Sequence, residues 1–255
     1  MSGTGPTEPP SLSFLPPLFG YRVNRTGQVT AVPNNADSDN QPSIKIARQI
    51  MDSYGIPPGT VGPRDPGGAL ELGVETWLRG ELPLLAPGRS WRVERHRPVS
   101  QFSQYAHLAR LQALIDNDAS KTLKSEIGSD YLIEPDVTVG LALSVGESLH
   151  ASVSCKWSIR SDRVQNIRHE AIILTRHRRG RQPHIVAVTA EPLPTRLASI
   201  ARGTGEVDGV YHVALDQLIV ATDAHGTREQ KDVLEELIGQ SRLFDLARLP
   251  LVLAD

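Results

Sequence analysis

The sequence predicts a single α/β domain in which a central mixed β-sheet is flanked by helices. A chain of 255 residues, 39% hydrophobic and 22% charged, can bury a sizeable core, and its length suits one large domain. Apolar residues recur at helical spacing in the first half of the chain. After Tyr131 they occupy alternate positions, as in strands that have one buried face. We therefore expect helices first and the sheet later in the chain.

The N-terminal segment, residues 1–42, is rich in Pro, Gly, Ser, Asn and Asp. These residues break regular structure, so the segment is predicted to be an irregular arm that can order on a partner. Residues 43–255 are predicted to form the folded domain. Ser43 is expected to cap its first helix, which ends near Pro57. The apolar face of this helix consists of Ile44, Ile46, Ala47, Ile50 and Met51.

Three further elements are expected before the sheet hairpin. A helix is predicted over residues 69–78, with Glu71 and Glu75 four positions apart and therefore on one face. Residues 91–99 read as a strand or an extended segment. Residues 101–117 carry apolar side chains at mixed spacings of three and four, which predicts an amphipathic helix.

From Tyr131 the pattern becomes strand-like, and residues 144–147 are a turn signal that predicts an antiparallel hairpin of residues 137–141 and 149–155. A helix is expected to start near Ser161, where serine favours capping, and to run to about Gly180. The remaining chain alternates between strands and helices. The expected elements are a buried strand at 184–191, a helix at 195–202, a strand at 209–213, and helices at 215–222 and 228–238.

Composition limits the class of protein. A single cysteine excludes a disulfide framework and a cysteine-rich zinc site, and it suits a reducing cytoplasm. The chain has no apolar run of membrane-spanning length and no signal-peptide pattern at its start, so we expect a soluble cytoplasmic protein without a membrane partner. A net charge of -2 does not suggest a general nucleic-acid coater. Residues 156–181, however, hold eight Lys or Arg against two acids, which indicates a phosphate-binding surface or a solvated helix face.

One constellation of residues is typical of phosphodiester hydrolysis, which needs a divalent cation, a positioned water and a nearby cationic or acidic group. Asp136 begins one hairpin strand and Lys156 ends its partner, so antiparallel pairing is expected to bring them together. Glu170 follows on the next helix, seven residues after Arg163 and therefore on the same face. Taken separately, Asp136 could be a strand-entry turn residue and Lys156 a lysine that extends to solvent from a strand end.

The residues beside Lys156 suit the edges of G·C pairs. Arginine binds guanine O6 and N7 in a bidentate manner, and a carboxylate can accept from the N4 amino group of cytosine. Arg160, Asp162 and Arg163 could therefore read two consecutive G·C pairs, and a two-fold axis would give CCGG. The alternative is a set of surface ion pairs at a helix start, which are common.

Together these motifs carry a family resemblance. They are the run SCKWSIRSDR at 154–163 with Glu170 after it, Pro135-Asp136 before it, and PHIV at 183–186 with TAEP at 189–192. This set resembles the NgoMIV-type restriction endonucleases, in the CCGG-reading group of the PD-(D/E)xK nuclease superfamily. The match is strongest from about Ser129 to Val213 and extends more loosely over most of the chain.

The resemblance implies a restriction-endonuclease-like fold for residues 43–255 and a type II endonuclease activity that depends on Mg²⁺. It implies double-stranded DNA as the partner, with cleavage of the palindrome GCCGGC after the first G and 5′-phosphate ends. It also implies a homotetramer, a dimer of dimers that engages two copies of the site.

The resemblance also implies roles for catalytic residues. Asp136 would ligate Mg²⁺, the backbone carbonyl of Cys155 would complete a metal shell, and Lys156 would orient and activate the attacking water. Glu170 would be a metal ligand that replaces the acid held two positions before the lysine in many such nucleases, where this chain has Ser154. Glu71 would be the acid on the N-terminal helix, with Glu75 as the competing choice.

For DNA binding, the resemblance implies that Arg160, Asp162 and Arg163 read the central CCGG. The outer G·C pair would be read by Arg196 and by polar residues of the arm, placed at Asp37 and Ser38. Two alternatives remain: a related CCGG-core endonuclease with a different outer pair, and a sequence-specific DNA-binding protein that does not cleave. A complete set of Asp136, Lys156 and Glu170 favours an enzyme, because a pure binder does not need a lysine beside a metal-type carboxylate.

Overall fold

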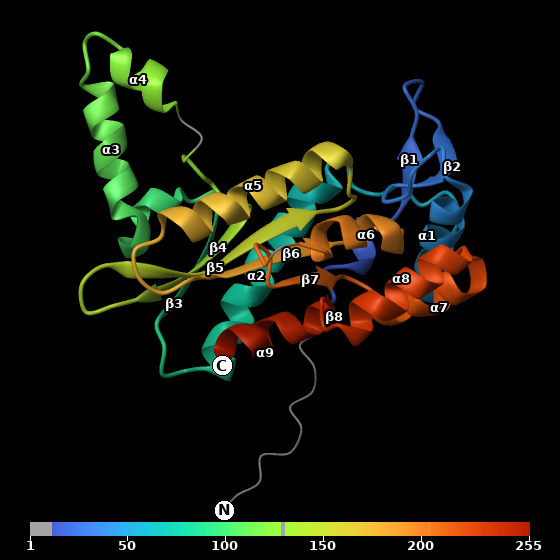
Figure 1. Cartoon of the computed structure of the whole chain (residues 1–255). Coiled ribbons are helices and arrows are strands. Elements are labelled where there is room, and N and C mark those ends of the chain that lie inside the picture. Colours follow the sequence, from blue (N-terminus) through green and yellow to red (C-terminus); the bar gives the residue numbers. More distant parts are fainter. Residues whose placement is uncertain (1–11, 129–130, 204) are drawn as a thin grey trace, which may run out of the picture.

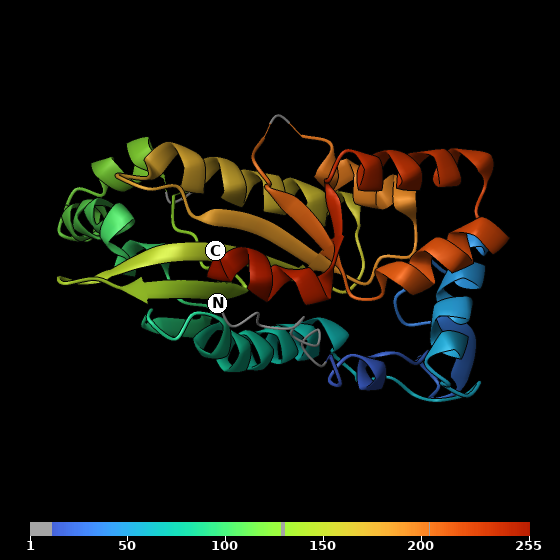
Figure 2. The same cartoon turned by 90° about the horizontal axis from the view of Figure 1, so that it is seen from below.

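The computed structural model describes residues 12–128, 131–203 and 205–255, and within this part the side chains of Ser161 and Asp162 are not described. A six-stranded sheet in the order β3-β4-β5-β6-β7-β8 runs through the molecule. Its first three strands are antiparallel and its last four are parallel, with β5 common to both sets. Figure 2 shows α2 on one face of the sheet and α5 with α6 on the other. The predicted α/β class, with a mixed sheet flanked by helices, is confirmed.

The strands of the main sheet are β3 (Trp91–Arg95), β4 (Val137–Ala142), β5 (Glu147–Lys156), β6 (His184–Thr189), β7 (Gly209–His212) and β8 (Leu243–Asp245). The described α-helices are α1 (Gln41–Ser53), α2 (Pro66–Leu85), α3 (Ala106–Asp116), α4 (Thr122–Ile127), α5 (Ser161–His177), α6 (Pro194–Ala201), α7 (Leu215–His225), α8 (Arg228–Gly239) and α9 (Leu249–Ala254). Figure 1 shows α1 at the end of the molecule next to a small two-stranded sheet formed by β1 (Tyr21–Val23) and β2 (Val29–Pro33).

The β4–β5 hairpin forms as its alternating pattern predicts. Gly146 takes φ 79° in its turn, a conformation that glycine adopts without a steric penalty. Val137 pairs with Val153, so the residue before β4 lies opposite the last residues of β5. The hairpin register therefore places Asp136 beside Cys155 and Lys156.

The parallel strands bring three loops to one edge of the sheet. Lys156 pairs with Thr189, and Thr189 pairs with His212, so β5, β6 and β7 end side by side. In open α/β sheets, ligands bind outside the carboxyl ends of the parallel strands. The loops at 157–160 and 190–193 are thus neighbours at the edge where function is expected.

The sheet is closely packed at this edge. Val153, Cys155 and Val188 have almost no exposed surface and belong to the main core, which the sheet forms with α2 and the C-terminal helices. A second core lies under α3 and α5 and includes Phe102 and Tyr105. The strand ends that carry the site are therefore held by close packing on both faces.

The structure corrects several boundaries. The described part of the segment 1–42 is less irregular than expected, since it contains β1 and β2. Asn40, rather than Ser43, caps α1: its side chain accepts from Ser43 N at 2.9 Å. Residues 131–133 lie outside any strand, and β8 and α9 were not predicted.

The helix expected at 69–78 is in fact α2, twenty residues long. Asp65 caps it, and Pro66 occupies its first turn, where proline costs no hydrogen bond. In the described ranges, no helix is long and apolar enough to cross a membrane.

Candidate active site

Asp136 and Lys156 meet at the open end of the hairpin. Asp136 directly precedes β4, and Lys156 is the last residue of β5. Asp136 Oδ2 accepts from Lys156 Nζ at 2.5 Å and from the backbone N of Cys155 at 2.7 Å. Two donors converge on one carboxylate oxygen, so the other oxygen, Oδ1, is left for a further ligand.

Glu170 lies on α5 and is electrostatically coupled to this pair. Burial and the charge of Asp136 raise the pKa of Glu170 to about 7, and Lys156 acts in the opposite direction. One charge shifts the pKa of another group this strongly only when the two groups are close together and partly shielded from water. The structure therefore brings Glu170 to the same site as Asp136 and Lys156.

Glu71 also faces this site, from α2 on the other side of the sheet. Its Oε2 lies 3.2 Å from His96 Nε2. Burial and the charge of Asp136 raise the pKa of Glu71, while His96 and Lys156 lower it. Glu71 lines a cavity of about 600 Å³ together with Cys155 and Lys156.

Glu75 does not share this environment. Its Oε1 lies 2.5 Å from Arg79 Nη2, and its Oε2 lies 3.2 Å from Arg95 Nε. Glu75 lies one turn along α2 from Glu71, and both of its oxygens are engaged, one by Arg79 of α2 and the other by Arg95 of β3. Of the two glutamates that the sequence left open, only Glu71 lines the cavity.

The acidic side chains around Lys156 suit a divalent cation. Among the described residues, no group of three or more His, Cys, Asp and Glu is close enough to hold a metal ion by itself. Mg²⁺, however, is usually held by one or two carboxylates plus water and substrate oxygens. Burial and the charge of Asp136 raise the pKa of both Glu71 and Glu170, so a cation bound among these carboxyl groups would lower the cost of holding them ionised. The donor set therefore fits a divalent cation.

The side chain of Cys155 takes no part in this chemistry. It is buried in the strand, and burial together with the charge of Asp136 raises the pKa of the thiol. A buried thiol with a raised pKa is unreactive. What Cys155 offers the site in this structure is its backbone N–H, which donates to Asp136 Oδ2.

A short loop leads from Lys156 to the predicted reading residues. Trp157 packs against Phe19, with ring centroids 4.8 Å apart, and its Nε1 donates to Asn34 Oδ1 at 3.0 Å. Ile159 is buried, and Arg160, which begins α5, is exposed. Trp157 and Ile159 thus anchor the loop just before an arginine that faces solvent.

Arg163 is placed differently from Arg160. Its Nη1 donates to the Ser158 carbonyl at 2.7 Å, and it lines the same cavity as Lys156 and Glu71. Arg160 lines a separate cavity of about 660 Å³. The side chain of Asp162, the third predicted reading residue, lies outside the described residues.

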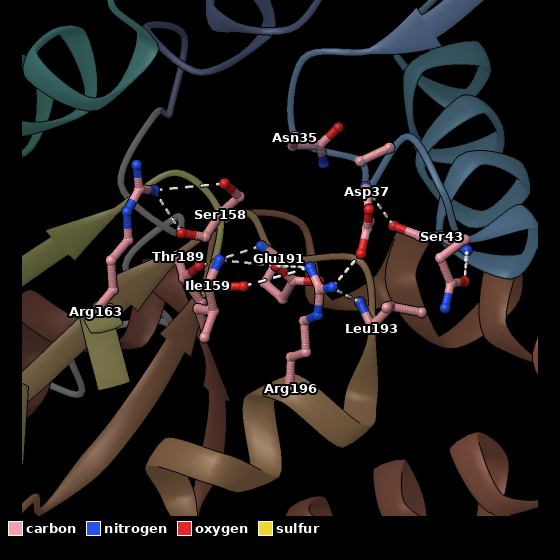
Figure 3. Close-up of polar contacts among 12 residues, drawn as sticks. Asn35, Asp37, Ser43, Ser158, Ile159, Arg163, Thr189, Glu191, Leu193 and Arg196 are labelled. Carbon is pink, nitrogen blue, oxygen red and sulfur yellow. Dashed lines mark hydrogen bonds and ion pairs between the residues drawn. The ribbon is translucent and has the colours of Figure 1, made fainter. Parts of the chain in front are cut away.

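The residues expected to read the outer pair gather in the cavity of Arg160. Arg196 on α6 forms an ion pair with Asp37 of the arm (Figure 3). Both residues line this cavity with Ser38. Ser38 is exposed. Four of the predicted DNA-binding residues, from segments far apart in sequence, thus line one hollow.

The sequence analysis assigned no role to two further residues, Arg22, which lines this hollow, and Glu191, which contacts its lining residues Ile159 and Arg196. Arg22 on β1 donates to the carbonyl of Ala36, and burial and the nearby charge of Arg160 lower its pKa. Glu191 follows β6 and is fully buried. Arg22 lacks any local sequence signal. Glu191 stands in the TAEP motif, but the motif alone does not reveal which segments the glutamate contacts.

Known proteins similar to this chain are restriction endonucleases. A crystal structure described as pre-specific restriction endonuclease BsaWI in complex with DNA is 16% identical with a TM-score of 0.34, covering 70% of this chain and 65% of that chain. The type II restriction enzyme NgoMIV of Neisseria gonorrhoeae is 37% identical over 262 residues, which cover 88% of this chain and 90% of that enzyme. The model of the NgoMIV restriction enzyme family matches residues 21–148 and 142–255. The chain therefore belongs to the NgoMIV restriction enzyme family of type II restriction endonucleases.

Proposed function

We propose that this endonuclease hydrolyses double-stranded DNA at GCCGGC, cutting after the first G with Mg²⁺ as cofactor and leaving 5′-phosphate ends. Residues 43–255 would form the catalytic domain and residues 1–42 an arm that contributes to reading. The observation that carries the proposal is the contact of Asp136 with Lys156, four residues before Arg160. Chemistry and base reading thus lie at one edge of the sheet.

The side chains suit an in-line attack of water on a phosphate. Asp136 and Glu170, with the carbonyl of Cys155, would hold Mg²⁺, which when bound neutralises charge on the phosphate and acidifies a ligated water. Lys156 is held by Asp136, so its remaining N–H groups are oriented toward the cavity, where one can donate to the attacking water or to a phosphate oxygen. Glu71 closes the cavity from α2.

The reading residues suit G·C pairs at both inner and outer positions. Arg160 and Arg163, with Asp162, would read the central CCGG through guanine O6 and N7 and cytosine N4. Arg196 and Asp37 again combine an arginine with an aspartate, and they lie together in one cavity with Ser38. A paired arginine and aspartate match guanine and cytosine of one base pair, which supports G·C as the outer pair.

Cleavage of a plasmid tests this proposal. The protein is incubated with Mg²⁺ and plasmids that carry one or two GCCGGC sites, and the new ends are sequenced. A matched plasmid that carries ACCGGT instead is the control. We expect cuts only between the first G and the following C, each with a 5′-phosphate.

The outcomes separate the alternatives. An uncut plasmid in the presence of folded protein would exclude the enzyme and leave a DNA-binding protein. Cuts in the ACCGGT control would show that only the outer pair is wrongly assigned. The proposed homotetramer predicts faster cleavage of the two-site plasmid and a tetramer mass in sedimentation with and without DNA.

A pair of matched variants tests the choice between the two glutamates of α2. We expect Glu71→Gln to lower the cleavage rate about 10- to 100-fold with little change in stability, because the residue faces Asp136 and Lys156. Glu75→Gln should instead destabilise the fold by roughly 1 to 3 kcal/mol, because it removes the charge that pairs with Arg79 and Arg95.

Single-turnover cleavage and urea unfolding measure the two effects. A Glu75→Gln protein that is as stable as the parent but inactive would reverse the assignment. The same conclusion would follow if Glu71→Gln cut DNA at the parent rate.

A further inference from the structure

Glu191 is an ionisable residue with no exposed surface. It lies in the loop after β6, beside the end of β5 that carries Lys156. It follows β6, whose last residue, Thr189, pairs with Lys156. Its side chain has 0% exposure. A buried carboxylate is costly unless hydrogen bonds or an opposite charge compensate it, so its partners indicate what it is for.

Each oxygen of Glu191 has its own partner (Figure 3). Oε2 accepts from the backbone N of Ile159 at 2.8 Å, and Oε1 accepts from the backbone N of Leu193 at 3.1 Å. Arg196 Nη1 lies 4.0 Å from Oε2. One carboxylate thus ties the loop before Arg160 to the start of α6.

Arg196 extends this connection to the arm. Its Nη1 donates to the carbonyl of Ile159 at 3.4 Å, and its Nη2 pairs with Asp37. The backbone next to Glu191 makes a second link, because the carbonyl of Ala190 accepts from Asn35 Nδ2 at 2.8 Å. Three segments that each carry a reading residue therefore converge on residues 190–191.

We propose that Glu191 is a positioning residue that couples recognition of the outer base pair, by Arg196 and Asp37, to recognition of the inner pairs by Arg160. The inference rests on the proposed function, since it takes these residues as the readers. A wrong outer base pair that shifts Arg196 would disturb the backbone of Ile159 in two ways. Arg196 contacts the carbonyl of Ile159 directly, and it neighbours Glu191, which accepts from the N–H of Ile159. Ile159 directly precedes Arg160 and lies three residues after Lys156, so the disturbance reaches inner reading and catalysis.

The substitution Glu191→Gln isolates this role because it nearly keeps the shape of the side chain. An amide has one acceptor oxygen, and its NH₂ group must face one of the two backbone N–H donors. Either Ile159 or Leu193 then loses its acceptor, and Arg196 loses a negatively charged neighbour. A buried N–H without an acceptor is unfavourable, so the loop or the start of α6 must move.

The test measures binding without Mg²⁺, and cleavage with it, on four duplexes: GCCGGC, ACCGGT with the outer pair changed, GCATGC with the inner pair changed, and ACATGT with both. In the parent we expect the combined penalty to be smaller than the product of the two single penalties, because coupled sites are not additive. In Glu191→Gln we expect discrimination against ACCGGT to fall at least about tenfold. The penalty on ACATGT should then equal the product of the penalties on ACCGGT and GCATGC.

Gln104→Leu is the matched control. Gln104 is also buried and bonds the N–H and the carbonyl of Leu149, at the other end of β5. We expect this variant to lose stability and keep the discrimination pattern of the parent. Should Glu191→Gln fail to fold, Asn35→Ala removes the link from the arm to Ala190 and should also make the penalties multiply.

The outcomes separate the inference from the function on which it rests. The inference alone is overturned if a folded Glu191→Gln protein discriminates against ACCGGT as the parent does and shows the same non-additive penalties for the inner and outer base pairs. It is also overturned if these two penalties already multiply in the parent. A parent that does not prefer GCCGGC, or an Arg196→Ala variant that still rejects ACCGGT, overturns the proposed function and the inference with it.

Discussion

Replacing Asp136 with alanine is expected to lower DNA cleavage by roughly three orders of magnitude or more, while specific binding remains measurable. Asp136 would be a metal ligand, and it also holds Lys156 Nζ at 2.5 Å. The variant therefore loses both the proposed cation site and the orientation of the lysine. Its reading residues stay in place, because they lie beyond the end of β5 on a loop with its own anchors at Asn34 and Glu191.

Asp136→Asn separates charge from geometry at the same position. Asparagine can still accept from the backbone N of Cys155, so this variant should keep the stability of the strand end. It should nevertheless cut almost as poorly as Asp136→Ala, because a neutral amide is a weak ligand for Mg²⁺. Single-turnover rates with Mg²⁺ and binding constants without it measure the two properties. A variant that cuts at the parent rate, or that loses specific binding along with cleavage, would contradict the assigned role.

Arg160→Ala is expected to remove most of the preference for CCGG. Each bidentate arginine contact to guanine contributes about 1 to 3 kcal/mol of discrimination, and a two-fold symmetric complex loses the contact twice. Arg160 is exposed at the start of α5 and lines the cavity it shares with Arg196 and Asp37, so its loss should leave the fold intact. Binding to CCGG-containing DNA should approach that to unrelated DNA.

Arg176→Ala is the matched control, since it removes the same charge from the exposed far end of the same helix. Binding of both variants to specific and inner-pair-substituted duplexes is compared at one salt concentration, because phosphate contacts make affinity depend strongly on salt. The control should keep the specificity ratio of the parent. Equal ratios for Arg160→Ala and the parent would show that Arg160 does not read the bases.

Local patterns were sufficient for the elements that carry Asp136, Lys156 and Glu170. Alternation predicted β4 and β5, a continuous apolar run predicted β6, and a capping serine at Ser161 predicted the start of α5. Short elements left no such signal. β1 and β8 have three residues each, which is too short for a recognisable alternating pattern. Each forms by pairing with a neighbouring strand, β1 with β2 and β8 with β7. The start of α2 was missed because Pro66, Gly67 and Gly68 resemble a loop until Asp65 caps them.

The sequence by itself determined the family, the class of fold and the juxtaposition of Asp136 with Lys156, because a hairpin of known turn position brings its strand ends together. Only the tertiary structure decided that Glu71 rather than Glu75 lines the cavity, and that Asp37, Arg196 and Ile159 meet around Glu191. Asp37 and Arg196 are 159 positions apart. Contacts at that separation depend on strand order, on the register of the parallel strands and on how the arm packs against them. No local periodicity encodes these properties.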